Sequence, residues 1–329
     1  MSENLNQSSH NLSFEIDETL RGQRLDKALS SLLPDVSRSH IQEWIKQKRV
    51  SVDGKVLKQT YKLEGEEHIE IDVPEAVAQD DWQAEDIPLN IVHEDEDLMV
   101  INKQAGLVVH PGAGNTSGTL LNALLHHVPE NINLPRAGIV HRLDKDTSGL
   151  MVVAKSEAAR LHLTEQLSSR TLSREYLALC LGNLISGATI KKRMHRDKRD
   201  RRKMTVVKDH EEGKEAITHY RIEQRFRKHT LVRVKLETGR THQIRVHMTY
   251  QGYPLVGDPV YGKRLVIPKQ CDADLEQQLR QIKRQALHAT AIAYEHPISG
   301  EVQSWQAPIP EDMQNLCNAL AVDVDNHSA

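Results

Sequence analysis

The chain has 329 residues, a formal net charge of −3 and a mean hydropathy of −0.55. Its length exceeds one core of ordinary domain size, so we expect two domains. No apolar run approaches the roughly 20 residues that span a bilayer, and residues 1–13 lack the apolar core of a signal peptide, so we expect a cytoplasmic protein without a membrane partner. The three cysteines lie too far apart to indicate a disulfide framework or a zinc site.

The N-terminal region is predicted to be a disordered tail, residues 1–15, followed by a small α/β domain, residues 16–75. Apolar residues at helical spacing predict two helices in this domain, the second capped by Ser37 or Ser39. Residues 50–56 then have the pattern of a hairpin with an Asp-Gly turn. Two helices and a small sheet are therefore expected here.

Basic side chains are concentrated on these two predicted helices, and we expect them to bind RNA. The alternative is a solvated basic face on an ordinary adaptor domain, because runs of charge are usually solvated. The residues concerned are Arg21, Arg24, Arg38, Lys46, Lys48 and Arg49.

The rest of the chain is predicted to be an acidic linker, residues 76–87, a larger domain, residues 88–314, and a C-terminal tail, residues 315–329. Apolar patterning predicts an α+β fold in the larger domain, with a mixed, largely antiparallel sheet and flanking helices. Strands are expected near residues 89–93, 98–102, 150–154, 175–181, 216–225 and 230–236, and helices near residues 119–126 and 156–169.

The run from Gly138 to Leu150 places Asp144 between two apolar segments. A carboxylate at the edge of a core stays ionised only if a cation or several donors compensate its lost hydration. Asp144 is therefore a candidate catalytic carboxylate. From this run alone it could equally form a structural ion pair with Arg142 or Lys145, or bond the residues of its own turn.

Residues 237–248 predict a short helix capped by Thr241. The positive N-terminal end of such a helix, together with Arg240 and Arg245, would suit an anion. The alternative is a strand, or an amphipathic helix whose arginines are merely exposed.

Residues 191–203 hold many more basic than acidic side chains, and we expect an electrostatic contact loop for RNA. If about six of these side chains neutralise phosphates, binding should fall with salt at a log–log slope near −4. The alternative is a disordered, solubilising loop. The residues expected to bind RNA are Lys192, Arg193, Arg196, Arg199 and Arg202.

No metal and no nucleotide cofactor are expected. The histidine pairs at 126–127 and at 242 and 247 lack the spacing and carboxylate neighbours of a metal site. Residues 110–114 lack the Lys-Ser/Thr ending of a phosphate-binding loop.

Three motifs follow one another along the chain: His141-Arg142-Leu143-Asp144, residues 173–178 (SREYLA) and residues 239–247 (GRTHQIRVH). With supporting matches at residues 106–112, 257–262 and 286–289, they resemble the pseudouridine synthase family that modifies structured RNA. The resemblance spans about residues 86–311. The N-terminal domain resembles the small RNA-binding domain of the fourth ribosomal protein of the small subunit.

The resemblance implies roles for single residues. Asp144 is the catalytic carboxylate, which attacks the ribose anomeric carbon or helps to form a glycal, and Arg245 pairs with it. Tyr176 stacks on the uracil and takes the proton from its carbon five, while Arg142 fills the gap left by the flipped nucleotide. Further substrate contacts are expected from His141, Leu143, Arg240, His242, Gln243 and Leu287.

The implied reaction is the site-specific isomerisation of uridine to pseudouridine in a loop of large-subunit ribosomal RNA, without a cofactor. We expect a monomer that acts on ribosomal RNA within an assembling large subunit. Residues 191–203 lack the proline that is usual in the family, which bears on the set of uridines modified. Two alternatives remain: a ribosome-assembly factor that binds RNA without catalysis, and a glycosidase-like hydrolase, for which Asp146 is a poorly placed second carboxylate.

Overall fold

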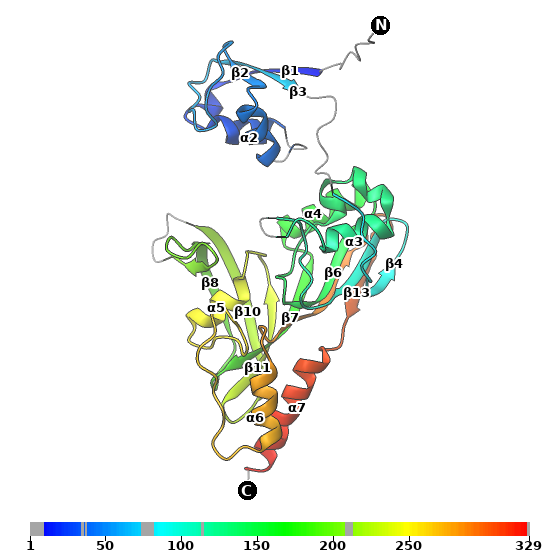
Figure 1. Ribbon diagram of the computed structural model, residues 1–329, viewed down its shortest axis with the longest axis vertical. Helices are drawn as coiled ribbons and strands as arrows, with labels where there is room; N and C mark the ends of the chain where they lie inside the picture. The colour runs from blue at the N-terminus through cyan, green and yellow to red at the C-terminus, as the bar shows by residue number, and fades with distance from the viewer. Residues whose placement is uncertain are drawn as a thin grey trace. The chain divides into compact units, whose positions relative to one another are not determined.

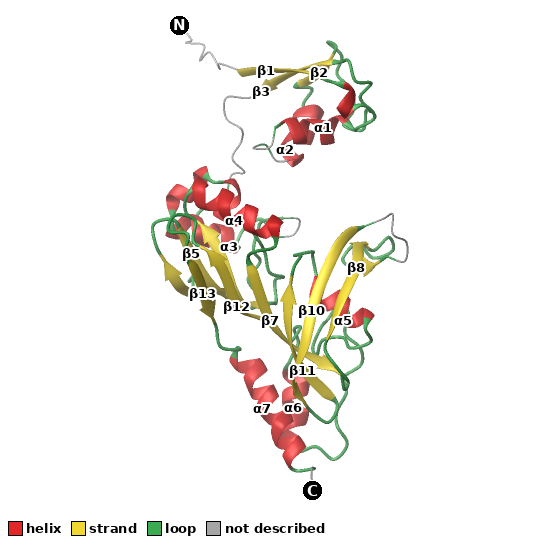
Figure 2. Cartoon of the chain, turned by 180° about the vertical axis from the view of Figure 1, so that it is seen from behind, coloured by secondary structure: helices red, strands yellow, loops and turns green. Residues whose placement is uncertain are grey.

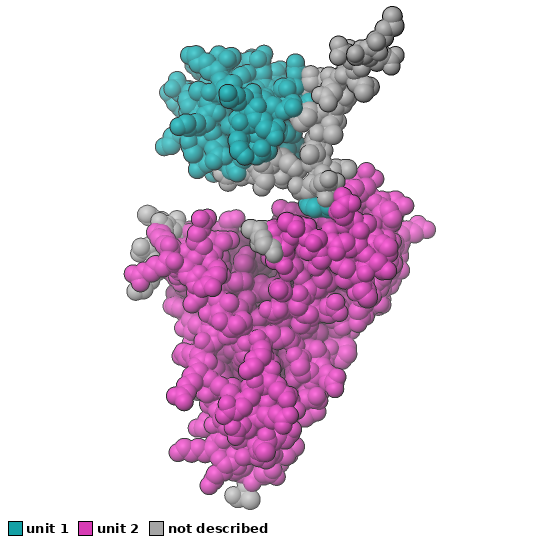
Figure 3. Space-filling view, in the orientation of Figure 1, with its two compact units in different colours: residues 1–82 teal, residues 83–329 magenta. Residues whose placement is uncertain are grey.

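The computed structural model describes residues 10–33, 36, 38–73, 82–112, 115–207 and 213–327. The chain divides into two compact units, residues 1–82 and residues 83–329 (Figure 3). Among the described residues, no helix has the length and apolar character needed to cross a membrane.

The small unit combines two helices with a three-stranded antiparallel sheet of order β1-β3-β2 (Figure 1). Leu25, Leu29 and Ile41 from the helices are buried against the sheet in one core. Ser39 lies inside α2 rather than capping it, and Ser37 lies outside the described residues. The elements are β1 His10–Glu15, the 3-10 helix η1 Glu18–Leu20, α1 Leu25–Leu32, α2 Arg38–Lys46, β2 Val50–Val52 and β3 His68–Val73.

Within the described residues, one prediction for the small unit is wrong and another holds in part. Residues 10–15 are not a disordered tail but strand β1, which pairs with β3 along its whole length. The Asp-Gly turn expected at residues 50–56 is present, because Val52 and Lys55 exchange two backbone hydrogen bonds of 2.9 Å, but the hairpin extends no further than this bridge, and β2 pairs with β3. Residues 1–9 of the predicted tail lie outside the described part of the chain.

The large unit is built on a mixed, ten-stranded sheet of order β4-β5-β6-β12-β7-β11-β10-β8-β9, with β13 paired to β12. The described pairs are antiparallel except β6 with β12, so the predicted α+β class is confirmed. The strands are β4 Ile91–Glu94, β5 Leu98–Lys103, β6 Ser148–Ala154, β7 Ser173–Leu181, β8 Ala188–Arg196, β9 Met204–Val206, β10 Lys214–Arg225, β11 His229–Leu236, β12 Leu287–Glu295 and β13 Val302–Gln306.

The helices of the large unit flank this sheet (Figure 2). Ser156 caps α4, because its hydroxyl accepts the backbone N–H of Ala159 at 3.2 Å. Helices α6 and α7 lie side by side, and their apolar residues share a core with β7 (Figures 1 and 2). The elements are α3 Leu120–His127, the 3-10 helices η2 Pro129–Asn133 and η3 Pro135–Gly138, α4 Glu157–Ser169, α5 Gln243–Tyr250, α6 Ala273–Gln281 and α7 Glu311–Asp325.

The predicted linker and C-terminal tail are also wrong where the structure describes them. The backbone N–H of Glu85 donates to the Asn122 carbonyl, and the Asn122 amide donates to the Gln83 carbonyl, which ties residues 83–85 to α3. Residues 74–81 lie outside the described residues. Instead of a tail from residue 315, α7 continues to Asp325 and buries Leu316 in the core.

The sheet divides beside β12, and this division makes room for the segment that carries Asp144. Strand β12 pairs with β6 only at His288 and Ala289, and the same edge of β12 then pairs with β13. Gly149 lies at the crossing point with φ of 117°, and a Cβ there would lie 2.2 Å from the Ala289 carbonyl oxygen. Only glycine fits so close an approach in this backbone conformation.

The edge of β6 that β12 leaves is occupied by the segment that follows η3. Ile139 forms a bridge with Val153, and Val152 donates its backbone N–H to Nε2 of His141 at 3.1 Å. The backbone groups of β6 are thereby satisfied, and the chain from residue 139 to residue 144 is anchored at the centre of the sheet.

Candidate active site

A cavity of about 450 Å³ in the large unit is lined by every residue that the sequence predicted to act on the substrate. The residues come from four separate segments: the loop before β6, strand β7, the start of α5 and the start of β12. They are His141, Arg142, Leu143, Asp144, Tyr176, Arg240, His242, Gln243, Arg245 and Leu287.

Arg245 joins two carboxylates at the wall of this cavity. Its Nη1 donates to Asp144 Oδ2 at 2.9 Å, while Nε and Nη2 donate to the two oxygens of Asp258 at 2.8 and 2.9 Å. Burial opposes the charge of Arg245, but the hydrogen bonds and charges of the two carboxylates outweigh burial and raise its pKa above the usual arginine value. The guanidinium therefore stays charged, and it holds Asp144 in one orientation.

Asp258 was missed as a site residue by the sequence analysis. Its side chain is fully buried and also accepts the backbone N–H groups of Val260 and Tyr261 at 2.8 and 3.0 Å. Burial alone would raise the pKa of Asp258, but Arg245 and these N–H groups lower it below the usual range. The only signal in the sequence was the supporting match at residues 257–262.

His242 faces Asp144 from the start of α5. It is the N-cap of the helix, in place of the predicted Thr241, and it has a left-handed backbone with φ of 56°. Its Nδ1 lies 2.8 Å from the Tyr261 hydroxyl, which accepts the backbone N–H of Met204 at 2.8 Å. We assign the imidazole proton to Nε2, which lies 4.0 Å from the acceptor Asp144 Oδ1, with the Tyr261 hydroxyl donating to Nδ1.

The imidazole of His242 is neutral. Burial lowers its pKa more strongly than the neighbouring charge of Asp144 raises it. The ring therefore presents an N–H group rather than a full positive charge to the carboxylate of Asp144.

Gln243 lines the cavity, but its amide is fully used within the protein. Its oxygen accepts from Thr238 and from the backbone of Arg240, and its nitrogen donates to Thr218 and to the Ile217 carbonyl. These bonds hold the loop before α5 against β10. The structure therefore favours a positioning role over the predicted contact with substrate.

Four further side chains of the pocket are uncharged: Leu143, Tyr176, Leu287 and His141. Leu143 and Leu287 are each 4% exposed, and Tyr176 is 5% exposed. Burial raises the pKa of Tyr176, so its side chain is a neutral phenol at neutral pH. Burial, with the charge of Arg174, lowers the pKa of His141 to about 3, so this imidazole is neutral as well.

Arg142 and Arg240 are exposed at the cavity. Arg142 forms no hydrogen bond or ion pair with any residue that the structure describes, whereas Arg240 donates its Nε to the Glu215 carbonyl at 2.9 Å. Arg142 is thus free to move into a nucleic acid without breaking a protein contact.

The basic residues of the small unit do not form one free cationic face. Several have an acidic neighbour, although exposed pairs of this kind contribute little and can exchange for phosphates. Lys48 is exposed, and the side chain of Arg38 lies outside the described part of the structure. The pairs are Arg21 with Glu18 at 2.9 Å, Arg24 with Asp26 at 3.0 Å, Lys46 with Glu43 at 3.5 Å and Arg49 with Asp72 at 3.0 Å.

The basic segment 191–203 is not a loop along its whole length: it includes the end of a strand and the turn of a hairpin. Residues up to Arg196 belong to β8, which pairs with β9 and β10. The Arg196 guanidinium donates to the Arg201 carbonyl, Arg202 pairs with Asp200 at 3.0 Å, and Lys192 lies over the Tyr250 ring. Arg193 and Arg199 are exposed on this hairpin.

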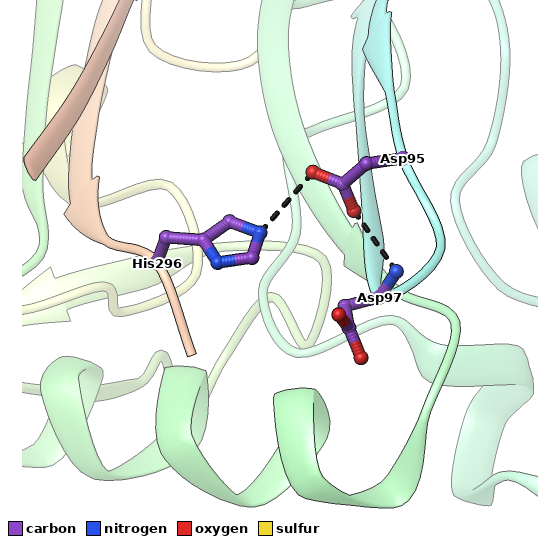
Figure 4. Close-up of side chains that lie close together, drawn as sticks. All are labelled: Asp95, Asp97 and His296. Atoms are coloured by element: carbon purple, nitrogen blue, oxygen red, sulfur yellow. Dashed lines mark hydrogen bonds and ion pairs between the residues drawn. The ribbon is translucent and has the colours of Figure 1, made fainter. Parts of the chain in front are cut away.

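Asp95, Asp97 and His296 place potential metal-binding atoms within 4.8 Å of one another (Figure 4). However, His296 Nδ1 accepts the backbone N–H groups of Ile298 and Ser299, so the proton is on Nε2, which points to Asp95 Oδ2 at 3.2 Å. Asp95 also accepts the backbone N–H of Asp97. These hydrogen bonds account for the cluster as a network that holds the β4–β5 turn.

Family models match both units of the chain. The RNA pseudouridylate synthase model matches residues 97–250, and the S4 domain model matches residues 23–69. The chain belongs to the RNA pseudouridine synthase family, so it is an enzyme of the isomerase class. The predicted family, fold and reaction class are confirmed, which leaves the hydrolase alternative without support.

Its curated relatives are similar along almost their whole length. The ribosomal large subunit pseudouridine synthase D of Salmonella typhimurium is 50% identical over 317 residues, which are 96% of this chain and 96% of that protein. The protein of the same name from Pseudomonas aeruginosa is 52% identical over 309 residues, covering 94% and 95%.

Solved structures show the same fold at lower identity. Human RNA pseudouridylate synthase domain containing 1 superposes with a TM-score of 0.52 at 26% identity, over 67% of this chain and 83% of that chain. Human RNA pseudouridylate synthase domain containing 4 gives a TM-score of 0.55 at 24% identity, over 70% and 93%.

Proposed function

We propose that the protein converts specific uridines of large-subunit ribosomal RNA to pseudouridine, with Asp144 as the catalytic carboxylate. The observation that carries this proposal is the 2.9 Å bond from Arg245 to Asp144 at the wall of the cavity. The substrate class is supported by the relatives, which are named for the large ribosomal subunit.

The reaction needs a carboxylate that is charged and fixed in direction. Arg245 and the Nε2–H of His242 face the two oxygens of Asp144. So oriented, the carboxylate of Asp144 either attacks C1′ of the ribose or promotes a glycal.

Tyr176 is suited to pack against the uracil as a neutral phenol. It lies in the cavity on β7, where burial raises its pKa above the usual tyrosine value. We therefore assign Tyr176 to holding the base, and the removal of the C5 proton that the family resemblance implied stays a prediction.

The apolar walls exclude water while the base is detached. Bulk water near the intermediate would divert it to hydrolysis, and Leu143 and Leu287 cover this part of the cavity. Arg142 is free to occupy the space that the flipped nucleotide leaves, and flipping costs least in a loop. A looped target is therefore expected.

The S4 domain and the basic hairpin extend the contact with RNA beyond one nucleotide. We propose that a monomer acts on an assembling large subunit. Pseudouridine mapping in ribosomal RNA from cells with and without the gene tests the function: sites should vanish without the gene and return with the wild-type gene. An unchanged map would overturn the proposal.

A further inference from the structure

Arg174 lies in the active-site cavity and has no part in the reaction as proposed so far. It precedes Tyr176 by two residues on β7, so both side chains leave the same face of the strand. Arg174 is only 7% exposed, and it lines the cavity together with Asp144. It is therefore a charged side chain placed beside the site of chemistry.

Among the described residues, this arginine has no counter-charge. Its Nε is buried without a hydrogen-bond partner, and no residue that the structure describes forms a hydrogen bond or ion pair with its guanidinium. Arg245 is buried to a similar extent but bonds two carboxylates. Because a buried, unpaired charge is costly, the missing partner of Arg174 is expected to arrive with the substrate.

The loop before α5 leaves space for this guanidinium. A Cβ on Gly239 would lie only 2.7 Å from Arg174 Nη1. The charge also acts on the cavity: it adds to the effect of burial on the pKa of His141, and it opposes the effect of burial on the pKa of Tyr176. The guanidinium of Arg174 is thus a positive charge next to two uncharged side chains, His141 and Tyr176.

We propose that Arg174 binds the uracil ring and stabilises the negative charge that the ring carries while it is detached from the ribose. This inference rests on the proposed function. When the C1′–N1 bond breaks, its electron pair stays on the ring and spreads over N1, O2 and O4, while C1′ is bonded to Asp144 or belongs to a glycal. When C5 attacks C1′, the ring becomes uncharged, and either the C1′–Asp144 bond breaks or the glycal takes back its C2′ proton. The C5 proton then passes to a carboxylate or to water while N1 takes up a proton, so the net change is an isomerisation.

At its buried position in the cavity, the guanidinium of Arg174 is better suited to bind the negatively charged uracil ring than a phosphate of the RNA backbone. Its N–H groups can donate to a ring carbonyl oxygen, and a preorganised donor acts on the charge as it develops. Phosphates of the RNA remain hydrated near the mouth of the cavity, where the exposed Arg142 and Arg240 lie. Arg174 is buried beside Tyr176, which faces the base.

Arg174→Gln and Arg174→Lys test the proposal with a fragment of large-subunit RNA. Single-turnover rates should fall by about 100-fold or more in Arg174→Gln and recover in part in Arg174→Lys. The Kd for RNA and its salt slope should stay within about twofold of wild type, because no phosphate contact is lost. The melting temperature should not fall, because an unpaired buried charge has been removed.

Three results would overturn the proposal. A rate within about threefold of wild type would show that Arg174 does not act on the ring. A weaker Kd with a salt slope reduced by about 0.7 would assign Arg174 to a phosphate. A large loss of stability that accounts for the lost rate would assign it a structural role.

A second measurement uses the wild-type enzyme and is independent of the folding of any variant. Sulfur accepts hydrogen bonds poorly. If Arg174 donates to O2 of the uracil, 2-thiouridine at the target should react about tenfold more slowly than uridine; if it donates to O4, 4-thiouridine should be the slow substrate. Equal rates for both thiouridines and uridine would contradict the proposal. If wild-type protein forms no pseudouridine in this RNA, the proposed function itself has failed.

Discussion

Arg245 and Asp258 form a bidentate pair, with Nε and Nη2 of the guanidinium bonded to the two carboxylate oxygens at 2.8 and 2.9 Å. This geometry leaves Nη1 for Asp144. Because bidentate pairs are directional, the position of Asp258 fixes where Arg245 points. Asp144, the proposed catalytic carboxylate, is thus oriented by a second, fully buried carboxylate that does not line the cavity.

Asp258→Asn should therefore impair catalysis, although the side chain of Asp258 does not line the cavity. The amide keeps the size of Asp258 but cannot balance the Arg245 charge, so we expect the single-turnover rate to fall by about 100-fold and the free energy of unfolding to fall by about 3 kcal/mol. Urea unfolding and rapid-quench kinetics measure the two effects. Exposed Asp274→Asn is the matched control, and a wild-type rate in Asp258→Asn would refute this role.

The hydroxyl of Tyr261 links the β8–β9 hairpin to His242. Tyr261→Phe leaves His242 Nδ1 and the Met204 N–H without their partner, so the rate should fall by about tenfold while the Kd for RNA stays unchanged. Tyr220→Phe is the control, because its hydroxyl bonds no described residue. A weaker Kd with an unchanged rate would show that Tyr261 serves RNA binding instead.

Arg142→Ala should separate base flipping from chemistry. The side chain has no partner among the described residues, so stability should not change. The rate on a structured stem-loop should fall by at least about tenfold, and the fall should be smaller on a short unstructured RNA, where flipping costs less. Equal losses on the two RNAs would argue against a role in flipping.

Buried neutral histidines should make the enzyme sensitive to acid. Burial lowers the pKa of His110, His229, His247 and His288 to about 4, whereas an unfolded histidine titrates near 6.5. Between these pH values the unfolded state binds more protons than the folded state. The free energy of unfolding therefore has its full value above pH 6.5 and falls as the pH drops towards 4. Each group contributes up to about 1.4 kcal/mol per pH unit.

The matched test compares His229→Gln with the exposed control His126→Gln. Urea unfolding at pH 7.5, 6.5 and 5.5 should give a shallower pH dependence in His229→Gln, because one titrating group is gone. His126→Gln should keep the wild-type dependence. Parallel curves for all three proteins would contradict the assignment of His229 as a buried neutral group.

The sequence predicted the elements whose apolar pattern is strong. Strands β5 and β6 are almost continuously buried, and their runs of apolar residues identified them. Strand β1 was missed, because its residues are mainly exposed and it is held by backbone pairing with β3. Strand β8 was taken for a loop, because only Ile190 and Met194 are buried in it and the residues between and after them are mainly basic.

The site was predictable as motifs but not as geometry. Asp144 and Arg245 were paired through a family resemblance, since no local pattern relates residues 101 positions apart. Asp258 and Arg174 were missed, because their importance lies in contacts made or lacking after folding: two bonds to Arg245 in one case, and a missing counter-charge in the other.

Replacement of Asp144 by Asn tests whether this carboxylate is catalytic, with Asp146→Asn as the neighbouring control. Pseudouridine formation in large-subunit RNA is measured under single turnover, together with the Kd for the same RNA. We predict that Asp144→Asn binds RNA within about threefold of wild type and forms no pseudouridine, while Asp146→Asn stays active. Pseudouridine formed by Asp144→Asn at the wild-type rate would contradict this prediction.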